Sequence, residues 1–357
     1  MTENNFTIDD MDRMILHALY VDGRAPFSRV AEVIGTSEQT VARRYRRLRD
    51  AGIARVVAQL AGDRLERSDW LLRLRVPSGG TPVAAALAAR PDTAWVELAS
   101  LGTEVFCVVR AQSDPDAAHL ALDELPVSEA IVGVEAHRAL HLFVDGPKPP
   151  ISLGDALSPE QVRRLRPARR HDPADRFPVA LREGDWPLVQ ALVEDGRTTY
   201  RELAQRTHWH ESTVRGRIDE LIRDRVLYFD LDTDTDRLGL ATRAVLWLSV
   251  EPAHLAAAGD ALAAHPEVPI VVATTGTTNL LASVVCRTDR DLYRYLTERV
   301  AELSGVRNVE VVPISRSLKR HVTVNTSHRQ HDARTLSGSS RPSARTSTIS
   351  PDEGPGR

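Results

Sequence analysis

The sequence predicts an α+β protein in which a three-helix unit and a βαββαβ unit each occur twice. Three observations support this prediction. An arginine-rich amphipathic helix lies near the N-terminus, hydrophobic runs with strand spacing follow it, and both patterns return in the second half. The chain has 357 residues, which is long enough for several domains.

The arginine-rich helix lies within residues 36–53. Ser37 is a good N-cap, and Gly52 permits the left-handed backbone that ends such a helix. Three apolar residues recur at helical spacing and define the face that we expect to be buried: Val41, Tyr45 and Leu48.

The opposite face of this helix carries long hydrogen-bond donors. Arginine pairs with guanine edges or phosphates and glutamine pairs with adenine, so such a face suits a helix in a DNA groove. A solvated cationic face is the alternative. We expect DNA contacts from Ser37, Gln39, Thr40, Arg43, Arg44, Arg46 and Arg47.

Two further helices are expected before this one. Residues 8–20 carry an apolar stripe and begin with aspartates at the positive end of the helix. Asp22-Gly23-Arg24 is a turn signal, 27–34 is a short helix, and Gly35 allows a tight turn. Two helices, a glycine turn and a basic helix form the helix-turn-helix plan.

The sequence here resembles the Lrp/AsnC family of transcription regulators. The matching residues stand at fixed spacing: Asp9, Asp12, Ile15, Leu16, Asp22-Gly23-Arg24, Ser37, Thr40, Val41, Arg43, Arg44, Arg47, Leu48, Gly52 and Ile53. The resemblance implies a winged-helix-like helix-turn-helix domain followed by a ferredoxin-like domain. In this family the second domain serves association and the sensing of small molecules, usually amino acids.

The residues after the basic helix agree with that plan. A strand is expected over 54–60, and then strands and helices alternate in the order βαββαβ. The expected ranges are 70–76, 81–89, 93–101, 105–109, 115–125 and 131–144.

The second half repeats the first at a constant offset of 173 residues. Asp195-Gly196-Arg197 repeats Asp22-Gly23-Arg24, and Thr213-Val214 repeats Thr40-Val41. A second βαββαβ order is expected over 243–250, 255–264, 270–275, 280–286, 292–303 and 306–314.

The expected domains follow from this repeat. Helix-turn-helix domains span 6–62 and 182–236, and ferredoxin-like domains span 68–145 and 240–320. We expect the two sheets to pack on each other, within one chain or between swapped chains, through Leu71, Leu72, Val245, Leu246, Trp247 and Val284.

Two segments are expected outside these domains. Residues 321–357 have almost no large apolar side chain and are expected to be disordered. Residues 146–181 form a linker in which 159–166 can make a helical turn or two. Its arginines either contact phosphate or lie in solvent, and we favour solvent. These arginines are Arg163, Arg164, Arg166, Arg169 and Arg170.

The second basic helix has a poorer surface for DNA. Gly216, Asp219 and Glu220 replace three outward arginines of the first copy. Carboxylates facing a duplex repel phosphate. We expect DNA contacts in this copy from Ser212, Thr213, Arg215 and Arg217, with binding carried mainly by the first copy.

An effector site is expected in the second ferredoxin-like domain. In the family, a turn between the second and third strands binds the effector. The corresponding residues are Thr275, Gly276, Thr277, Thr278 and Asn279, whose glycine, hydroxyls and amide suit an amino acid. A plain hairpin turn is the alternative, because the two aspartates of the family turn are absent.

Composition limits the remaining functions. The net charge is −3, so DNA affinity requires local basic patches. No run is long enough for a membrane span and no signal peptide is visible, so we expect a cytoplasmic protein without a membrane partner. Cys107 and Cys286 lie in apolar runs and are expected to be buried.

Three functions remain after this reading. The leading one is a sequence-specific regulator that binds double-stranded DNA, responds to an amino acid or a similar small molecule, and forms homo-oligomers. The second is an architectural DNA-binding protein with little specificity. The third is an enzyme like the siroheme decarboxylases, whose subunits resemble this family. No nucleophile–base pair or metal-ligand cluster is visible, so we expect no enzyme, cofactor or metal.

Overall fold

A computed structural model describes residues 7–60, 67–77, 79–112, 130–144, 148–166, 181–320 and 323–324. No helix in these ranges is long and apolar enough to cross a membrane. The helix expected over 115–125, nearly all of the expected tail, and Arg169 and Arg170 of the linker lie outside them. Cys107 and Cys286 are buried free thiols, as predicted.

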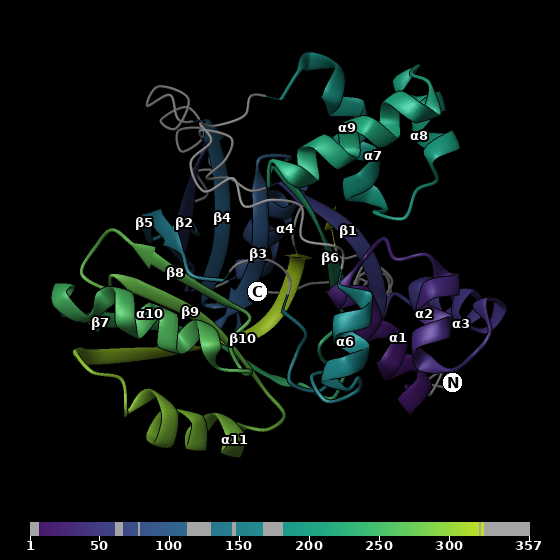
Figure 1. Ribbon diagram of the computed structural model, residues 1–357. Coiled ribbons are helices and arrows are strands. Elements are labelled where there is room, and N and C mark those ends of the chain that lie inside the picture. Colours follow the sequence, from purple (N-terminus) through teal and green to yellow (C-terminus); the bar gives the residue numbers. More distant parts are fainter. Residues whose placement is uncertain are drawn as a thin grey trace, which may run out of the picture. The chain divides into compact units, whose positions relative to one another are not determined.

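The first half of the chain contains one helical unit and one sheet unit. The helical unit comprises α1 (Asp10–Val21), α2 (Phe27–Ile34), α3 (Glu38–Asp50) and the strand β1 (Ala54–Leu60) (Figure 1). The sheet unit comprises β2 (Arg67–Arg75), α4 (Gly80–Ala89), β3 (Thr93–Ala99), the short turn η2 (Ser100–Gly102), β4 (Glu104–Gln112) and β5 (Gly133–Leu142). These elements confirm the predicted α+β class.

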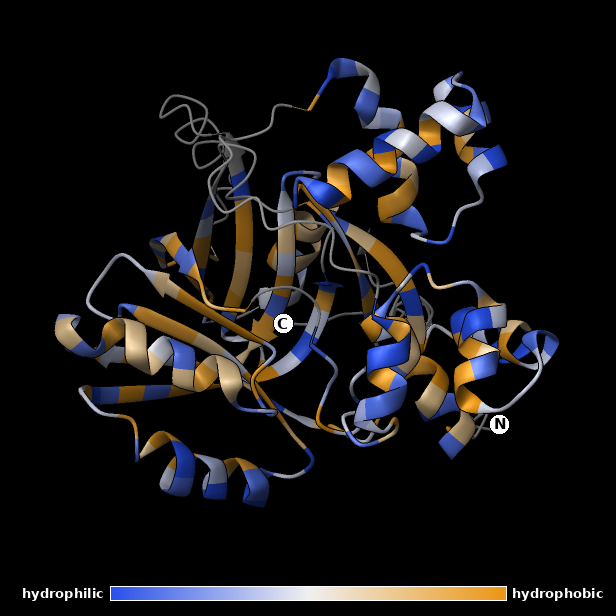
Figure 2. Cartoon of the chain, in the orientation of Figure 1, coloured by the Kyte–Doolittle hydropathy of each residue, from blue (hydrophilic) through white to orange (hydrophobic). Residues whose placement is uncertain are grey.

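The second half repeats this order. Its helical unit comprises η3 (Glu183–Asp185), α7 (Trp186–Glu194), α8 (Tyr200–Thr207), α9 (Glu211–Arg223) and the strand β6 (Leu227–Thr233). Its sheet unit comprises β7 (Thr242–Val250), η4 (Pro252–His254), α10 (Leu255–Ala264), β8 (Ile270–Thr274), β9 (Leu280–Cys286), α11 (Asp289–Arg294), the π-helical turn η5 (Tyr295–Val300), β10 (Val306–Arg320) and β11 (Thr323–Val324). Figure 2 shows the helices of both helical units banded in the two hydropathy colours, as one buried face predicts.

The strands of the two sheet units form one closed ring. Its order is β10-β3-β4-β2-β5-β8-β9-β7, and β7 pairs again with β10. The two copies are joined at both seams by long last strands. β5 pairs with β2 of its own copy and then with β8, and β10 pairs with β7 of its own copy and then with β3.

The inner faces of the two sheets share a hydrophobic core. Side chains alternate along a strand, so Leu71 faces inward while Leu72 packs against α4. The inner core comprises Leu71, Ala99, Phe106, Val245, Trp247, Val272, Leu281 and Val312. The predicted packing of the two sheets is therefore confirmed within one chain. Leu72, Leu246 and Val284 are exceptions among the predicted contacts, because they belong to the outer cores of the two copies.

The two helical units are joined through their strands. β1 pairs antiparallel with β6 over the whole length of both strands. Ala58 of β1 lies in the core of the second helical unit, and Leu231 of β6 lies in the core of the first. Each helical unit thus completes its core with a residue from the other copy.

The connecting segment is not a solvated linker where the structure describes it, at 148–166. Leu153, Leu157 and Leu165 are buried in the core of the first helical unit. The helix α6 (Pro159–Leu165) forms where the sequence suggested a helical turn or two. It begins with a capping box at Ser158 and lies beside α1 and α2 (Figure 1). The expectation of a solvated linker is corrected because three spaced leucines give this segment an apolar face, whereas the side chains of Arg163, Arg164 and Arg166 are exposed as expected.

Polar contacts hold the same segment in place. Arg29 of α2 donates to the carbonyl of Arg164 at 2.6 Å, and Arg164 pairs with Glu32 at 2.7 Å. The backbone N–H of Leu157 donates to Nδ1 of the buried His17 at 3.2 Å. These contacts fix α6 on the first helical unit.

Candidate nucleic-acid interface

The helix α3 forms as its sequence predicts. The Ser37 hydroxyl accepts from the N–H of Thr40 at 3.2 Å and caps the helix. The side chains of Val41, Tyr45 and Leu48 are buried. Gly52 follows the helix with a φ of 68°, in the left-handed region. These residues fix which face of α3 is turned away from the core.

The outward face of α3 carries three exposed side chains one helical turn apart. They are Gln39, Arg43 and Arg46. No hydrogen bond or ion pair joins these three side chains to other residues in the described ranges. Ser37 and Thr40 lie at the start of the same helix with their hydroxyls 2.8 Å apart. This face therefore offers unused donors to a ligand.

Arg44 is held by the first helix instead of pointing outward. Its guanidinium lies 2.7 Å from Asp9 and 3.0 Å from Asp12. Hydrogen bonds to these carboxylates raise the pKa of Arg44 above its ordinary value. Arg47 is partly held by the first helix and partly open to solvent. It pairs with Asp12 at 2.6 Å, and its side chain is half exposed. Arg44 was expected to contact DNA, but its guanidinium is already engaged by these two carboxylates.

Arg217 of α9 takes the equivalent position and is more deeply buried. Its side chain is 5% exposed, and it contacts the fully buried carboxylate of Asp185 at 2.5 and 2.8 Å. Glu220 contacts the same guanidinium at 2.7 Å. Arg217 was expected to lie on the flank of the helix, but this ion pair turns it into the core.

The rest of α9 offers little to a duplex. Ser212 and Thr213 are exposed in its first turn, and Arg215 is exposed with its guanidinium 4.5 Å from the centre of the Tyr200 ring. Gly216 has open space around it where the first copy has Arg43. The outward stripe of α3 therefore has no counterpart on α9.

The expected effector turn is largely occupied by the protein itself. The side-chain amide of Asn279 accepts from and donates to the backbone of Val250, at 2.9 and 2.8 Å. The hydroxyl of Thr275 accepts from the N–H of Arg138 at 2.9 Å. Gly276 and Thr277 are exposed, and Thr278 is partly buried. Asn279 was expected to bind an effector, but its amide is already committed to β7.

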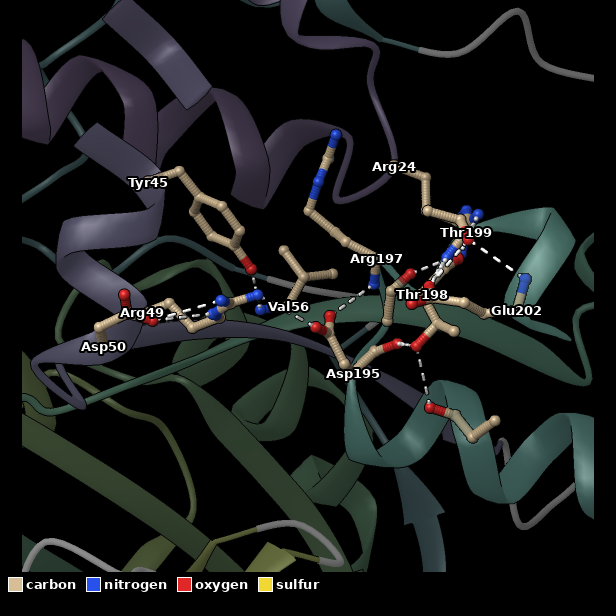
Figure 3. A network of polar contacts seen from close by, with 12 residues as sticks. Arg24, Tyr45, Arg49, Asp50, Val56, Asp195, Arg197, Thr198, Thr199 and Glu202 are labelled. Atoms are coloured by element: carbon tan, nitrogen blue, oxygen red, sulfur yellow. Dashed lines mark hydrogen bonds and ion pairs between the residues drawn. The ribbon is translucent and has the colours of Figure 1, made fainter. Parts of the chain in front are cut away.

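Two turns that the sequence marked only as turns hold the helical units together (Figure 3). Arg24 donates to the carbonyls of Gly196 and Thr198 at 2.6 and 3.2 Å. Arg197 donates to the carbonyls of Gly23 and Ala25 at 2.7 and 3.0 Å. We call this reciprocal pair the arginine clamp. The recurrence of Asp-Gly-Arg at the repeat offset is the signal that could have revealed it.

The comparisons with known proteins agree with this architecture. The AsnC-type helix-turn-helix domain matches residues 8–49 and 183–222, and the Lrp/AsnC ligand binding domain matches residues 243–324. An uncharacterized HTH-type transcriptional regulator of Pyrococcus abyssi is 33% identical over 133 residues, which are 37% of this chain and 84% of that protein.

Most of this chain also aligns with an enzyme. The siroheme decarboxylase NirDL subunit of Paracoccus denitrificans is 30% identical over 275 residues, which are 74% of this chain and 79% of that protein. A crystal structure of a siroheme decarboxylase NirDL superposes with a TM-score of 0.58 at 15% identity, over 92% of this chain and 99% of that chain.

These two matches correct the expectation that the chain is not an enzyme. Missing catalytic motifs were the basis of that expectation, yet a decarboxylase uses the same tandem architecture. The family itself is shown by the domain matches and by the identity to the Pyrococcus regulator. The chain belongs to the Lrp/AsnC family, in a form that carries two helix-turn-helix units.

Proposed function

We propose that this chain is a DNA-binding transcription regulator whose contact with the duplex is carried mainly by α3. One observation supports the proposal most directly: Gln39, Arg43 and Arg46 form an exposed stripe of donors without partners in the described residues. A stripe of this kind can reach base edges and phosphates from within a major groove.

The proposal includes a difference between the two copies. On α9 the residues that correspond to Arg43 and Arg46 are Gly216 and Asp219. A glycine contributes no donor, and a carboxylate repels phosphate. The first copy would read bases, and the second would add phosphate contacts through exposed arginines such as Arg215 and Arg223.

Removing the stripe tests the proposal. DNA fragments bound by the full chain are first selected from genomic DNA. Arg43→Ala with Arg46→Ala is then expected to weaken binding to the selected fragment by roughly 30-fold or more, because a base-reading arginine contributes about 1–3 kcal/mol. Titration at several salt concentrations measures the loss.

Arg215→Ala with Arg223→Ala is the matched control on the second copy. It is expected to cost less affinity and to lower mainly the salt dependence, by about one unit of slope for each phosphate that the variant no longer binds. Equal losses from both pairs would contradict the proposed difference between the copies. A weak, sequence-independent interaction of the unmodified chain would favour an architectural role.

Response to an amino acid is a finer part of the proposal. Exposed groups remain at Gly276 and Thr277, although Asn279 is engaged. A thermal-shift screen with the twenty amino acids, repeated with Thr277→Val, tests this turn. A stabilisation that survives Thr277→Val places the effector elsewhere.

Siroheme decarboxylation is the second candidate, supported by the likeness to NirDL over nearly the whole chain. A related NirDL structure contains an iron-uroporphyrin III analogue. A spectrophotometric titration of this chain with an iron-uroporphyrin tests the candidate directly. Tight binding with a shifted absorption band, together with absent DNA binding, would favour the enzyme over the regulator.

A further inference from the structure

The two arginines of the clamp also pack against aromatic rings. The Arg24 guanidinium lies 5.0 Å from the centre of the Tyr200 ring and 5.4 Å from that of Phe229. The Arg197 guanidinium lies 4.0 Å from the centre of the Phe27 ring. Each arginine thus stacks on aromatic rings of the other copy as well as binding its carbonyls.

At the glycines of the two turns, the two copies lie too close together to admit a side chain. A Cβ on Gly196 would lie 2.8 Å from the Val56 side chain, and one on Gly23 would lie 3.0 Å from the Phe229 side chain. The N–H of Gly196 also donates to the carbonyl of Val56 at 2.8 Å. The second turn therefore meets β1 in direct backbone contact, and the first turn lies against side chains of β1 and β6.

The clamp also reaches both recognition helices. Arg197 lies 5.8 Å from the ring centre of Tyr45 on α3, and Asp195 lies 3.5 Å from Arg49 on the same helix. On the other side, the Tyr200 ring that holds Arg24 also carries Arg215 of α9. A continuous set of contacts thus joins α3 to α9.

We infer that Arg24 and Arg197 are positioning residues that hold the two helix-turn-helix units in one fixed relative orientation. The orientation of α9 relative to α3 is then set by the protein before it meets a ligand. On a duplex, the second unit falls at one fixed distance from the half-site read by α3. The fixed orientation of the two units is the geometric half of this inference and does not depend on DNA binding. The fixed distance on a duplex is the functional half and rests on the proposed DNA binding.

A distance measurement without DNA tests the geometric half. Nitroxide labels are attached to Glu38→Cys and Glu211→Cys, which are exposed first residues of α3 and α9. The native Cys107 and Cys286 are only 2% and 3% exposed, so labelling is selective. We expect a narrow distance distribution in the otherwise unmodified full chain.

Arg24→Lys with Arg197→Lys keeps both charges but removes the forked donation and the stacking. The distance distribution is then expected to widen at least twofold, whereas the exposed Arg237→Lys is expected to leave it unchanged. Arg24→Lys alone serves if the double variant does not fold. An unchanged width in the clamp variants would overturn the inference.

A hydroxyl-radical footprint on the selected DNA fragment tests the functional half. The unmodified chain is expected to protect the half-site and a second backbone segment at a fixed distance. The lysine variants are expected to protect the half-site as the unmodified chain does. Their protection of the second backbone segment is expected to fall by at least half. A second protection that stays intact overturns the positioning role.

Failure of the proposed function looks different from failure of the clamp. If the full chain selects no fragment from genomic DNA, that result refutes DNA binding and the functional half together. The label distances still decide the geometric half in that case.

Discussion

Arg44 and Arg217 occupy the same position in the two copies and do the same structural work. Each binds an aspartate of the helix that precedes the helix-turn-helix, Asp12 or Asp185, and both aspartates are fully buried. Arginine in a recognition helix therefore serves two purposes here. The outward arginines face solvent, while this one ties the recognition helix to the first helix of its unit.

This ion pair predicts a large loss of stability when it is broken. Arg217→Met leaves the Asp185 carboxylate buried without its partner, so the free energy of unfolding is expected to fall by about 3–5 kcal/mol. Urea unfolding measures the change. Arg223→Met, on the same helix and exposed, is the matched control and is expected to change stability by no more than about 0.5 kcal/mol. A loss below about 1 kcal/mol for Arg217→Met would contradict the structural role of the pair.

The same pair predicts a pH dependence. Burial opposes ionisation of Asp185, but the hydrogen bonds from Arg217 and from the backbone of Arg182, together with the charges of both arginines, outweigh it, so the pKa of Asp185 lies below its ordinary value. The unfolded state then binds a proton more readily than the folded state. The stabilisation is fully present above the ordinary pKa of about 3.9 and is lost as the pH falls below it. Unfolding free energies measured between pH 5 and 3 should fall less steeply for Asp185→Asn, and an equal slope would contradict this.

At the scale of single elements, the two recognition helices share a buried face and differ on the outer one. Val41 and Leu48 of α3 correspond to Val214 and Leu221 of α9, and all four are buried. The outer faces differ without a change in packing, since a Cβ at Gly216 would meet no neighbour. The two helices therefore pack in the same way although their outer surfaces differ.

Two glycine substitutions should have opposite effects for this reason. Gly216→Ala is expected to stabilise the chain by roughly 0.5–1 kcal/mol, because alanine favours a helix interior and no neighbour obstructs its Cβ. Gly196→Ala is expected to destabilise it by about 1–3 kcal/mol, because its Cβ would press on Val56. Thermal unfolding of both variants checks the pair of signs, and a shift of the same sign in both would refute it.

At the scale of the whole molecule, the closed ring of strands makes each copy dependent on the other. The inner core draws on both sheets, and both seams are formed by a last strand that crosses to the other copy. A single copy would expose Leu71 and Phe106 to water. One chain thus already contains the paired arrangement of two sheet units.

Truncation tests this dependence. A chain ending at residue 166, which keeps α6, is expected to pair with a second copy of itself or to aggregate, because its inner sheet face has no cover. Light scattering on the truncated and full chains distinguishes these states. A folded monomer of the truncated chain would show that the shared core is dispensable. Further association of full chains stays a prediction, which the mass of the full chain tests.

The sequence by itself determined most of the described elements, the duplication and the buried faces of the helices. Periodicity fixed α2 and β1 at their observed bounds, and the constant offset of the repeat announced the second copy. These properties depend on neighbours along the chain, so local spacing carries the information. The family resemblance rested on the same residues.

Only the tertiary structure decided what the polar side chains do. Arg43 and Arg44 are adjacent in the sequence, yet one faces solvent and the other pairs with Asp12, more than thirty residues away. The Asp-Gly-Arg turns likewise appeared as local turns, and their partners lie in the other copy. Ion pairs and clamps join residues that are distant along the chain, and their geometry exists only once both copies have folded against each other.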